Sequence, residues 1–189
     1  MDLQDFAKMQ EEPASWERIV ENCNELISHA RTSMWTVLHV MHIKGYHSEV
    51  VTYGSGYDFG KEMLITKKLD ILSEDDSEII TAKNYPSWHA GHVLASGVDR
   101  QENDLLAVKS GLSALANYTI LSELRKRKIK RILTIGFQRG VCVLSTALDA
   151  VNFDFDSYIV KDCTNDDPLH QSTKRVQMID LQRAKNFPL

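Results

Sequence analysis

The chain has 189 residues, 43% of them hydrophobic and 25% charged, and a formal net charge of −4. This length suffices for one domain with a full hydrophobic core, and the small negative charge gives no reason to expect nucleic acid or an anionic membrane as a partner. No apolar run approaches the ~20 residues of a membrane span, and the N-terminus has no signal-peptide pattern. Three widely spaced cysteines without a CxxC pair favour a reducing compartment. We therefore expect a single cytoplasmic domain over residues 1–189.

Helical and strand patterns alternate along the chain. After Pro13, apolar residues at helical spacing predict an amphipathic helix with the inward face Trp16, Ile19, Val20, Cys23, Leu26, Ile27 and Ala30. Short apolar runs predict strands at 35–41, 104–108, 131–136 and 156–160. Further helices are expected at 113–127, with Ala114, Leu115, Tyr118, Leu121 and Leu124 inward, at 141–152 and at about 168–180. Such units predict a parallel sheet with helices on both faces and a ligand at the carboxyl ends of its strands.

The segment from about 43 to 101 has no clear periodicity, apart from a strand-like run at Glu78 to Thr81. So long a connection within a compact domain usually has a function, and we interpret it as a substrate-specificity insertion. Its aromatic side chains either wall a substrate pocket or pack the insertion onto the core. The candidates for the pocket wall are Tyr57, Phe59, Tyr85, Trp88 and His89.

One cysteine lies where a predicted strand becomes a helix. Gly136 and Gly140 supply turn freedom after the strand, and apolar residues at helical spacing follow, so that Cys142 falls in the first helical turn. The unpaired N–H groups and the helix dipole at that position would stabilise a thiolate. The alternative for Cys142 is a small apolar residue buried at the start of a helix. We interpret Cys23, on an apolar helix face, and Cys163, in a loop, as structural or incidental.

Three blocks of the sequence resemble the isochorismatase-like cysteine hydrolases. The cysteine motif of that family is matched by Gly136, Cys142, Val143, Thr146, Ala147, Asp149 and Ala150. Residues 102–115 are similar to its acidic-apolar strand and Lys-x-x-x-Ser-Ala-Phe motif, with Leu115 in place of Phe, and residues 158–162, followed by His170, are similar to its next strand and loop. The resemblance implies a three-layer, Rossmann-like α/β domain and a homo-oligomer, a dimer or tetramer. We expect no cofactor.

The resemblance also implies roles for individual residues. Cys142 would be the nucleophile and Lys109 the cation that holds its thiolate, while an aspartate takes the thiol proton. Backbone N–H groups of Cys142 and Gln138 would bind the oxyanion, with a cis peptide bond between Phe137 and Gln138. We expect Phe137 and Trp88 to contact substrate. Arg139 stands where the family often has Thr, and either binds a substrate carboxylate or caps a loop at the surface.

The aspartate is the least well matched position. The family places it at the end of the first strand in an Asp-x-Gln-x-x-Phe motif, which predicts Asp2, although the gap from Gln4 to Phe6 is one residue shorter here. Asp5 is the fallback. No residues precede Asp2 to form that central strand, so we expect it to be short or missing. Three interpretations stay open: the true N-terminus lies upstream, another segment or subunit fills the gap, or catalysis has been lost.

Histidines raise the question of a metal, because nicotinamidases of this family bind one near their second strand. His39, His42 and His47 occupy that neighbourhood, but no Asp accompanies them, and the first two fall on opposite faces of a strand. We therefore predict no metal site. The sequence as a whole predicts a hydrolase of a small amide or carbamoyl C–N bond acting through a thioacyl intermediate. The alternatives are a catalytically silent relative that binds a metabolite or protein, and an isochorismate-type vinyl-ether hydrolase, which would need an acid rather than a thiol.

Overall fold

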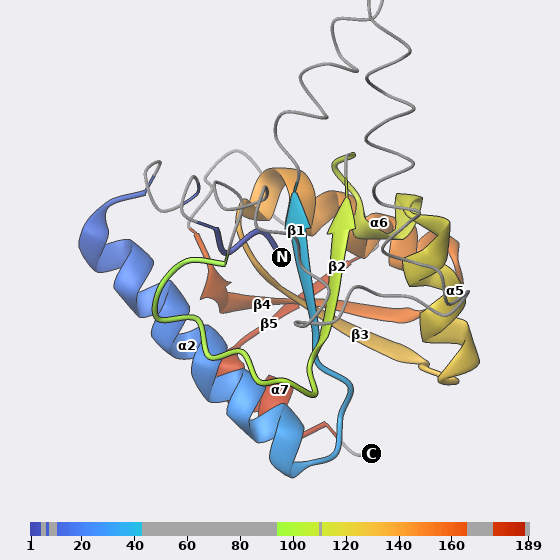
Figure 1. Cartoon of the computed structure of the whole chain (residues 1–189), viewed down its shortest axis with the longest axis horizontal. Coiled ribbons are helices and arrows are strands. Elements are labelled where there is room, and N and C mark those ends of the chain that lie inside the picture. The colour runs from blue at the N-terminus through green and yellow to red at the C-terminus, as the bar shows by residue number, and fades with distance from the viewer. Residues whose placement is uncertain (5–6, 8–10, 43–93, 110, 166–175, 188–189) are drawn as a thin grey trace, which may run out of the picture.

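The computed structural model describes residues 1–4, 7, 11–42, 94–109, 111–165 and 176–187 (Figure 1). Several predictions lie outside these residues: the strand at 78–81, the fallback base Asp5, and His47 and His170. The pocket aromatics Tyr57, Phe59, Tyr85, Trp88 and His89 also lie outside them. Among the described helices, none is long and apolar enough to cross a membrane.

The described strands all pair in parallel. β1 (Leu38–His42) pairs with β2 (Leu105–Lys109), and β3 (Arg131–Gly136), β4 (Asp156–Thr164) and β5 (Gln177–Ile179) form a second sheet in that order. The four strands predicted within the described residues are thus present, β3 with the predicted bounds and the other three with shifted ends. The helix expected at about 168–180 is wrong where the chain is described, because 177–179 adds β5 to the sheet edge and the helix α7 (Leu181–Lys185) begins only after Asp180 caps it.

The N-terminal residues lie between the two sheets. Met1 donates its terminal N–H to Ile135 O (2.9 Å) and accepts from Phe137 N (3.1 Å), whereas Asp2 N donates to Val40 O (2.8 Å). Residues 1 and 2 therefore bond to β3 on one side and β1 on the other, which is the position expected for the short first strand.

Gln4 extends this link with its side chain. Its amide donates to His42 O (3.1 Å) and accepts from His42 N (2.7 Å), so the side chain pairs with β1 as a backbone would. Gln4 is fully buried. These bonds fix Asp2 at the carboxyl end of β1.

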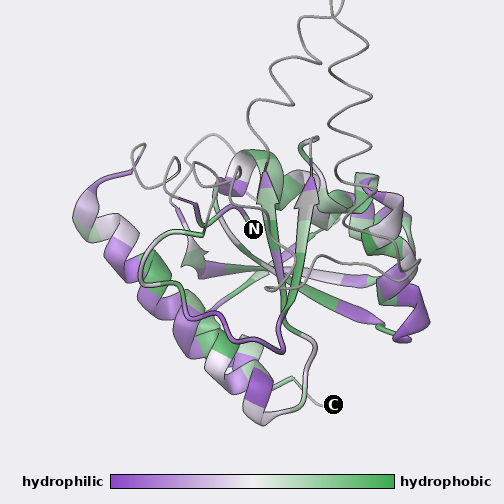
Figure 2. Cartoon of the chain, viewed as in Figure 1, coloured by the Kyte–Doolittle hydropathy of each residue, from purple (hydrophilic) through white to green (hydrophobic). Residues whose placement is uncertain are grey.

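Helix α2 (Pro13–Thr32) has the inward face predicted from its spacing. Its buried residues are Trp16, Ile19, Val20, Cys23, Leu26, Ile27 and Ala30. Proline at its first turn suits the helix start, where no N–H partner is needed. Figure 2 shows the helix banded in green and purple along its length, as an amphipathic helix requires. This face packs with Leu133 and Ile135 of β3 in one apolar cluster.

Helices α5 (Tyr118–Lys126) and α6 (Leu144–Asn152) pack on the other face of β3. Ile132 of β3 belongs to the cluster that contains Leu121 of α5 and Ala150 of α6. Because neighbouring side chains of a strand point to opposite faces, α2 and the α5–α6 pair cover opposite faces of β3. The predicted α/β architecture, with parallel strands and helices on both faces, is confirmed to this extent.

The helix predicted at 113–127 is broken in two. A 3-10 turn, η3 (Ala114–Ala116), comes first, and Asn117 then caps α5 by accepting from Thr119 N (2.9 Å). Since the helical phase starts at Tyr118, Ile120 turns inward, and Tyr118, predicted to face inward, is 79% exposed.

Candidate active site

Three segments bring Asp2, Lys109 and Cys142 together. Lys109 Nζ lies 3.0 Å from Asp2 Oδ2, 3.3 Å from Cys142 Sγ and 3.0 Å from the carbonyl oxygen of Gly111. Lys109 ends β2 and is 3% exposed, so its charge is held almost wholly within the protein. The ammonium therefore bridges a carboxylate and a thiol at the carboxyl ends of parallel strands, where ligands of such sheets bind.

Asp2 is a buried carboxylate with few hydrogen bonds. It is 2% exposed, and its backbone has a positive φ of 49°. Its close contact with Lys109 is an ion pair, but neither carboxylate oxygen has a well-aligned donor among the described residues. The carboxylate also acts on the Cys142 thiol, because its negative charge raises the pKa of that thiol.

Cys142 lies in the π-helical turn η4 (Arg139–Val143), two residues before α6 begins. Burial, followed by the negative charge of Asp2, raises the pKa of its thiol to about 11, and this outweighs the lowering effect of Lys109. The sequence predicted a thiolate stabilised in the first turn of an α-helix. The structure differs, because the π-turn separates the cysteine from α6 and the site withholds solvent, so the resting residue is a thiol at neutral pH.

The loop before Cys142 contains the predicted cis peptide bond between Phe137 and Gln138. Gly136, which ends β3, has a φ of 107°, and a Cβ there would collide with the carbonyl oxygen of Met1. This position therefore requires glycine. The N–H groups of Gln138 and Cys142 stay the predicted oxyanion donors.

The side chains of Phe137 and Arg139, both predicted to contact substrate, instead contact other residues of the protein. The Phe137 ring is 3% exposed and meets Trp16 edge-on at a centroid distance of 6.3 Å, within the core beside α2. Arg139 donates through Nε to Thr164 Oγ1 (2.7 Å) and through Nη2 to Lys161 O (2.8 Å). Trp88, the third predicted substrate contact, lies outside the described residues.

Two of the histidines considered for a metal site are described. His39 Nε2 lies 3.1 Å from Asp104 Oδ2, in a network that also includes Arg31. His42 aligns with Lys109 in the β1–β2 pair. In the part of the chain that the structure describes, no three His, Cys, Asp or Glu side chains are grouped to hold a metal ion.

Sequence reasoning missed three residues that support the site. Gly111 accepts from Lys109, Gln4 pairs with β1, and Asn165 Oδ1 accepts from Arg139 N at 2.8 Å. Gln4 belongs to the Asp-x-Gln match, and that motif could have pointed to it. Nothing in the spacing of Asn165 signalled a contact 26 residues away.

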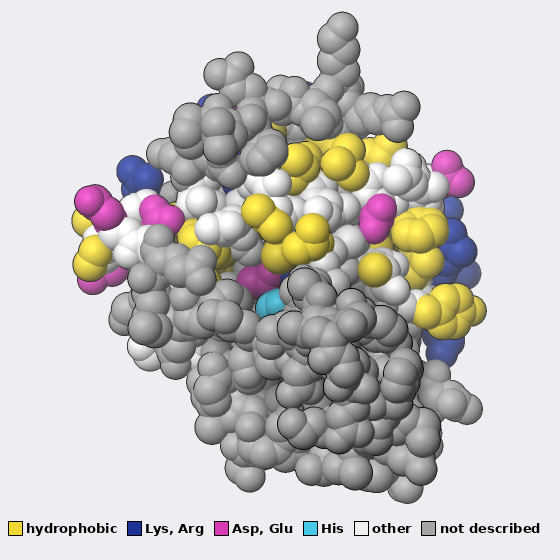
Figure 3. All heavy atoms as spheres, turned by 90° about the horizontal axis from the view of Figure 1, so that it is seen from above, with side chains coloured by type: hydrophobic (Ala, Val, Ile, Leu, Met, Phe, Trp, Pro, Cys, Tyr) yellow, Lys and Arg dark blue, Asp and Glu magenta, His cyan; other side chains and the backbone are white. Residues whose placement is uncertain are grey.

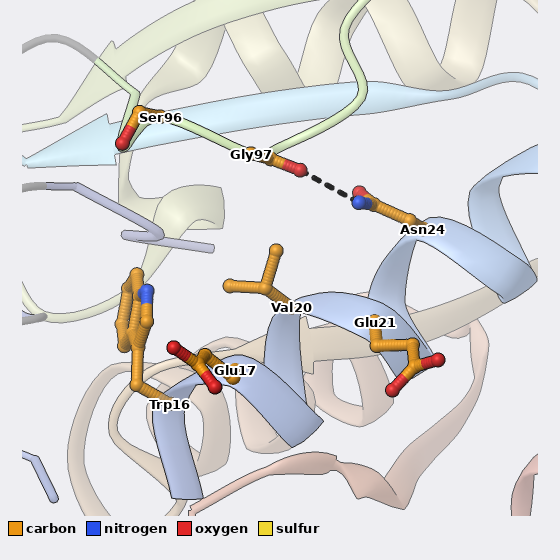
Figure 4. Close-up of a pocket in the computed structure, with 7 residues that line it drawn as sticks. All are labelled: Trp16, Glu17, Val20, Glu21, Asn24, Ser96 and Gly97. Carbon is orange, nitrogen blue, oxygen red and sulfur yellow. Dashed lines mark hydrogen bonds between the residues drawn. The ribbon is translucent and has the colours of Figure 1, made fainter. Parts of the chain in front are cut away.

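The face toward which β1 and β2 point is shown in Figure 3. Apolar side chains are spread across its described part, acidic side chains lie among them and at the edges, and one histidine is visible beside an acidic side chain. A separate hollow of about 380 Å³ lies between α2 and the segment around Gly97 (Figure 4), where Asn24 Nδ2 donates to Gly97 O at 2.7 Å. Its lining does not include Asp2, Lys109 or Cys142.

The fold is α/β, and Asp2, Lys109 and Cys142 lie together at the carboxyl ends of its parallel strands. The isochorismatase domain model matches residues 1–184. The chain therefore belongs to the isochorismatase domain family.

Individual relatives are distant. Ureidoacrylate amidohydrolase RutB of Variovorax paradoxus is 28% identical over 104 residues, which are 43% of this chain and 41% of that protein. The match thus spans about two-fifths of the relative. An isochorismatase family protein from Burkholderia thailandensis superposes with a TM-score of 0.65 at 18% identity, over 97% of this chain and 90% of the other. N-carbamoylsarcosine amidase from Thermoplasma acidophilum gives 0.59 at 15%, over 90% and 86%. These two structures share the fold.

Proposed function

We propose that the protein is a cysteine-dependent hydrolase that cleaves a small amide or carbamoyl C–N bond through a thioacyl intermediate on Cys142. The observation that carries this proposal is the position of the Lys109 ammonium, 3.0 Å from Asp2 Oδ2 and 3.3 Å from Cys142 Sγ. Two of the relatives reported above are named as an amidohydrolase and an amidase, which favours the C–N bond.

The first half of the reaction forms the acyl-enzyme. Asp2 takes the thiol proton as Cys142 Sγ attacks the substrate carbonyl carbon, and Lys109 stays beside the developing thiolate. The N–H groups of Gln138 and Cys142 bind the oxyanion. When the tetrahedral intermediate collapses, the C–N bond breaks and the proton on Asp2 passes to the departing amine.

The second half returns the free enzyme. Asp2, again a carboxylate, takes a proton from water as the water attacks the thioester carbonyl. The C–S bond breaks, the carboxylate product leaves, and the proton goes back to the Cys142 sulfur. No cofactor is needed for this cycle.

The raised pKa of Cys142 fits this sequence of steps. A thiol with a pKa of about 11 is protonated at rest, so nucleophile activation must coincide with substrate attack. An adjacent carboxylate without well-aligned donors can accept that proton. We further propose that the segment 43–101 sets the choice of substrate and that the protein acts as a homo-oligomer.

The test combines thiol labelling with turnover. Limiting iodoacetamide at pH 9, followed by peptide mass spectrometry, should label Cys142 in preference to the fully buried Cys23 and Cys163. Lys109→Met should slow this labelling, since the thiolate loses its adjacent cation. A panel of small amides and carbamoyl compounds is then screened for ammonia or amine release, with Cys142→Ala as the inactive control.

The outcome separates the classes considered for this protein. Selective labelling of Cys142 together with release of amine that Cys142→Ala abolishes would support the hydrolase. Labelling spread evenly over the three cysteines, with no turnover, would instead favour a catalytically silent relative that binds a metabolite or protein.

A further inference from the structure

We propose that Arg139 is a positioning residue that clamps the loop bearing Gln138 and Cys142 against the end of β4. This inference rests on the proposed function, because the loop matters only if its N–H groups bind an oxyanion. Arg139 follows Gln138 directly and is the first residue of the turn that carries the nucleophile.

Arg139 makes three hydrogen bonds, two to β4 and one to Asn165, the residue that follows this strand. Its backbone N donates to Asn165 Oδ1 (2.8 Å), its Nε to Thr164 Oγ1 (2.7 Å) and its Nη2 to Lys161 O (2.8 Å). Thr164 is 3% exposed, and its hydroxyl also donates to Lys161 O (3.0 Å). Both the main chain and the side chain of Arg139 are therefore fixed to the end of the neighbouring strand and the residue that follows it.

An irregularity in the pairing of β4 with β3 leaves backbone groups of β4 free to bond to Arg139. Thr134 of β3 aligns with Ile159 of β4, but Gly136 aligns with Thr164, so β4 has extra residues between these pairs and its ladder is irregular there. A carbonyl within such an irregularity is turned away from the regular ladder. Lys161 lies in it, and its carbonyl oxygen accepts from both Arg139 and Thr164.

The clamp would fix the position of the proposed oxyanion donors, the N–H groups of Gln138 and Cys142. Within the loop, Val141 N and Val143 N both donate to Gln138 O, which shapes the turn but does not attach it to the sheet. Oxyanion donors work because they are fixed in place before charge develops. The bonds from Arg139 supply that attachment one residue from Gln138.

This role differs from carboxylate binding, which was one of the two alternatives that the sequence left open for Arg139. The Nε–Nη2 edge of the guanidinium already faces Thr164 and Lys161. A substrate carboxylate that bound this edge in a bidentate manner would have to break both bonds. The clamp serves neutral and anionic substrates alike, whereas carboxylate binding would favour anionic ones.

Two thiol reagents separate clamping from general damage. Iodoacetamide alkylates the Cys142 sulfur by displacing iodide, and no oxyanion forms. With p-nitrophenyl acetate, the sulfur attacks the ester carbonyl, the thiol proton goes to Asp2, and p-nitrophenolate departs to leave an acetyl thioester, so an oxyanion forms on the way. The ratio of acylation rate to alkylation rate therefore reports on the oxyanion loop.

We expect Arg139→Met and Thr164→Val to lower this ratio about 10- to 100-fold, less than the roughly 10²- to 10³-fold cost of losing an oxyanion donor outright. Thr164→Ser, which keeps the hydroxyl, should restore the ratio to within about threefold of wild type. Arg183→Met removes an exposed arginine on α7 and should leave the ratio unchanged.

Failure of the clamp is distinguishable from failure of the proposed function. If wild type itself neither alkylates nor acylates at Cys142, the proposed function fails. If wild type reacts at Cys142 but Arg139→Met keeps the wild-type ratio, or lowers both rates equally, the clamp is overturned. The clamp also fails if Arg139→Met slows acylation by the anionic ester mono-p-nitrophenyl glutarate while p-nitrophenyl acetate reacts normally.

Discussion

Two buried aspartates, Asp104 and Asp2, each form an ion pair with a cationic side chain, but they differ in how many other hydrogen bonds they accept. Asp104 Oδ1 accepts from Arg31 Nε at 3.1 Å, and its Oδ2 accepts from Gln101 N at 2.9 Å and contacts His39 and Arg31. Asp2 has an ion pair with Lys109, but neither of its oxygens has a well-aligned donor among the described residues.

The two carboxylates therefore lie in different electrostatic environments. Burial alone would raise the pKa of Asp104, but the bonds from Arg31, Gln101 and His39 outweigh burial and lower it. A carboxylate so fully bonded holds α2 to the start of β2 and keeps its charge. The negative charge of Asp2 instead acts on Cys142, where it contributes to the raised pKa of the thiol. The number of aligned donors, rather than burial, distinguishes Asp104 from Asp2, to which we assign the role of proton acceptor.

The largest effect expected is that of Asp2→Asn on catalysis. The amide cannot accept the thiol proton, so acylation by an amide substrate should fall by about 10²- to 10⁴-fold. Alkylation of Cys142 by iodoacetamide should be faster, because the negative charge that raises its pKa is gone. Stopped-flow acylation and alkylation rates, measured on the same samples, check this. Equal losses in both rates would mean that Asp2 acts only through the fold.

Asp104→Asn should do the reverse, lowering stability while sparing the chemistry. Breaking a buried ion pair costs roughly 3–5 kcal/mol, but Arg31 is partly exposed, so we expect about 2–3 kcal/mol. Urea unfolding followed by circular dichroism measures the loss. Alkylation of Cys142 in the folded protein should match wild type, and a slower rate would break the distinction between the two aspartates.

The same network predicts a pH dependence of stability. Burial lowers the pKa of His39 below its usual value, despite its bond to Asp104, so the folded state holds the ring neutral while the unfolded state protonates it near 6.5. The unfolded state then binds more protons, and this stability is complete above about pH 6.5 and declines as the pH falls toward the lower folded pKa. His39→Asn should flatten the decline in urea unfolding between pH 8 and pH 5. An unchanged slope would assign it to other groups.

The smallest effect is expected at the surface pair of Lys185 and Glu25. Glu25 is 48% exposed at its side chain, so solvent screens the pair. Glu25→Gln should change the free energy of unfolding by less than about 0.5 kcal/mol. If Glu25→Gln lowered the thermal unfolding temperature as much as Asp104→Asn does, the expectation that buried, well-bonded pairs contribute more stability than exposed ones would be wrong.

Local periodicity predicted much of the fold, and family motifs predicted Asp2, Lys109 and Cys142, the three residues that the structure brings together. The inward face of α2 follows from spacing alone, and Cys142 and Lys109 come from motifs in which neighbouring residues constrain one another. The break at Asn117 was missed because apolar spacing continues across it, while a side-chain cap decides where α5 starts. The helix expected near 168–180 failed over 177–179 because a short edge strand leaves too few residues to show a period of two.

Long-range contacts account for what the sequence did not show. The position of Asp2 depends on backbone bonds to Val40, and that of its neighbour Met1 on bonds to Ile135 and Phe137. The environment of Arg139 depends on Thr164, 25 residues along the chain. No local pattern records such pairings, because they arise only when the two sheets and the N-terminal residues assemble.

The most direct test of the account is capture of the thioacyl intermediate. Wild type is mixed with p-nitrophenyl acetate, quenched in acid within milliseconds to seconds and analysed by peptide mass spectrometry. The account predicts an acetyl group on Cys142 that forms with the burst of p-nitrophenolate, decays by hydrolysis, and decays much more slowly in Asp2→Asn. Acetylation that is absent from Cys142, or that appears there but never turns over in wild type, would contradict it.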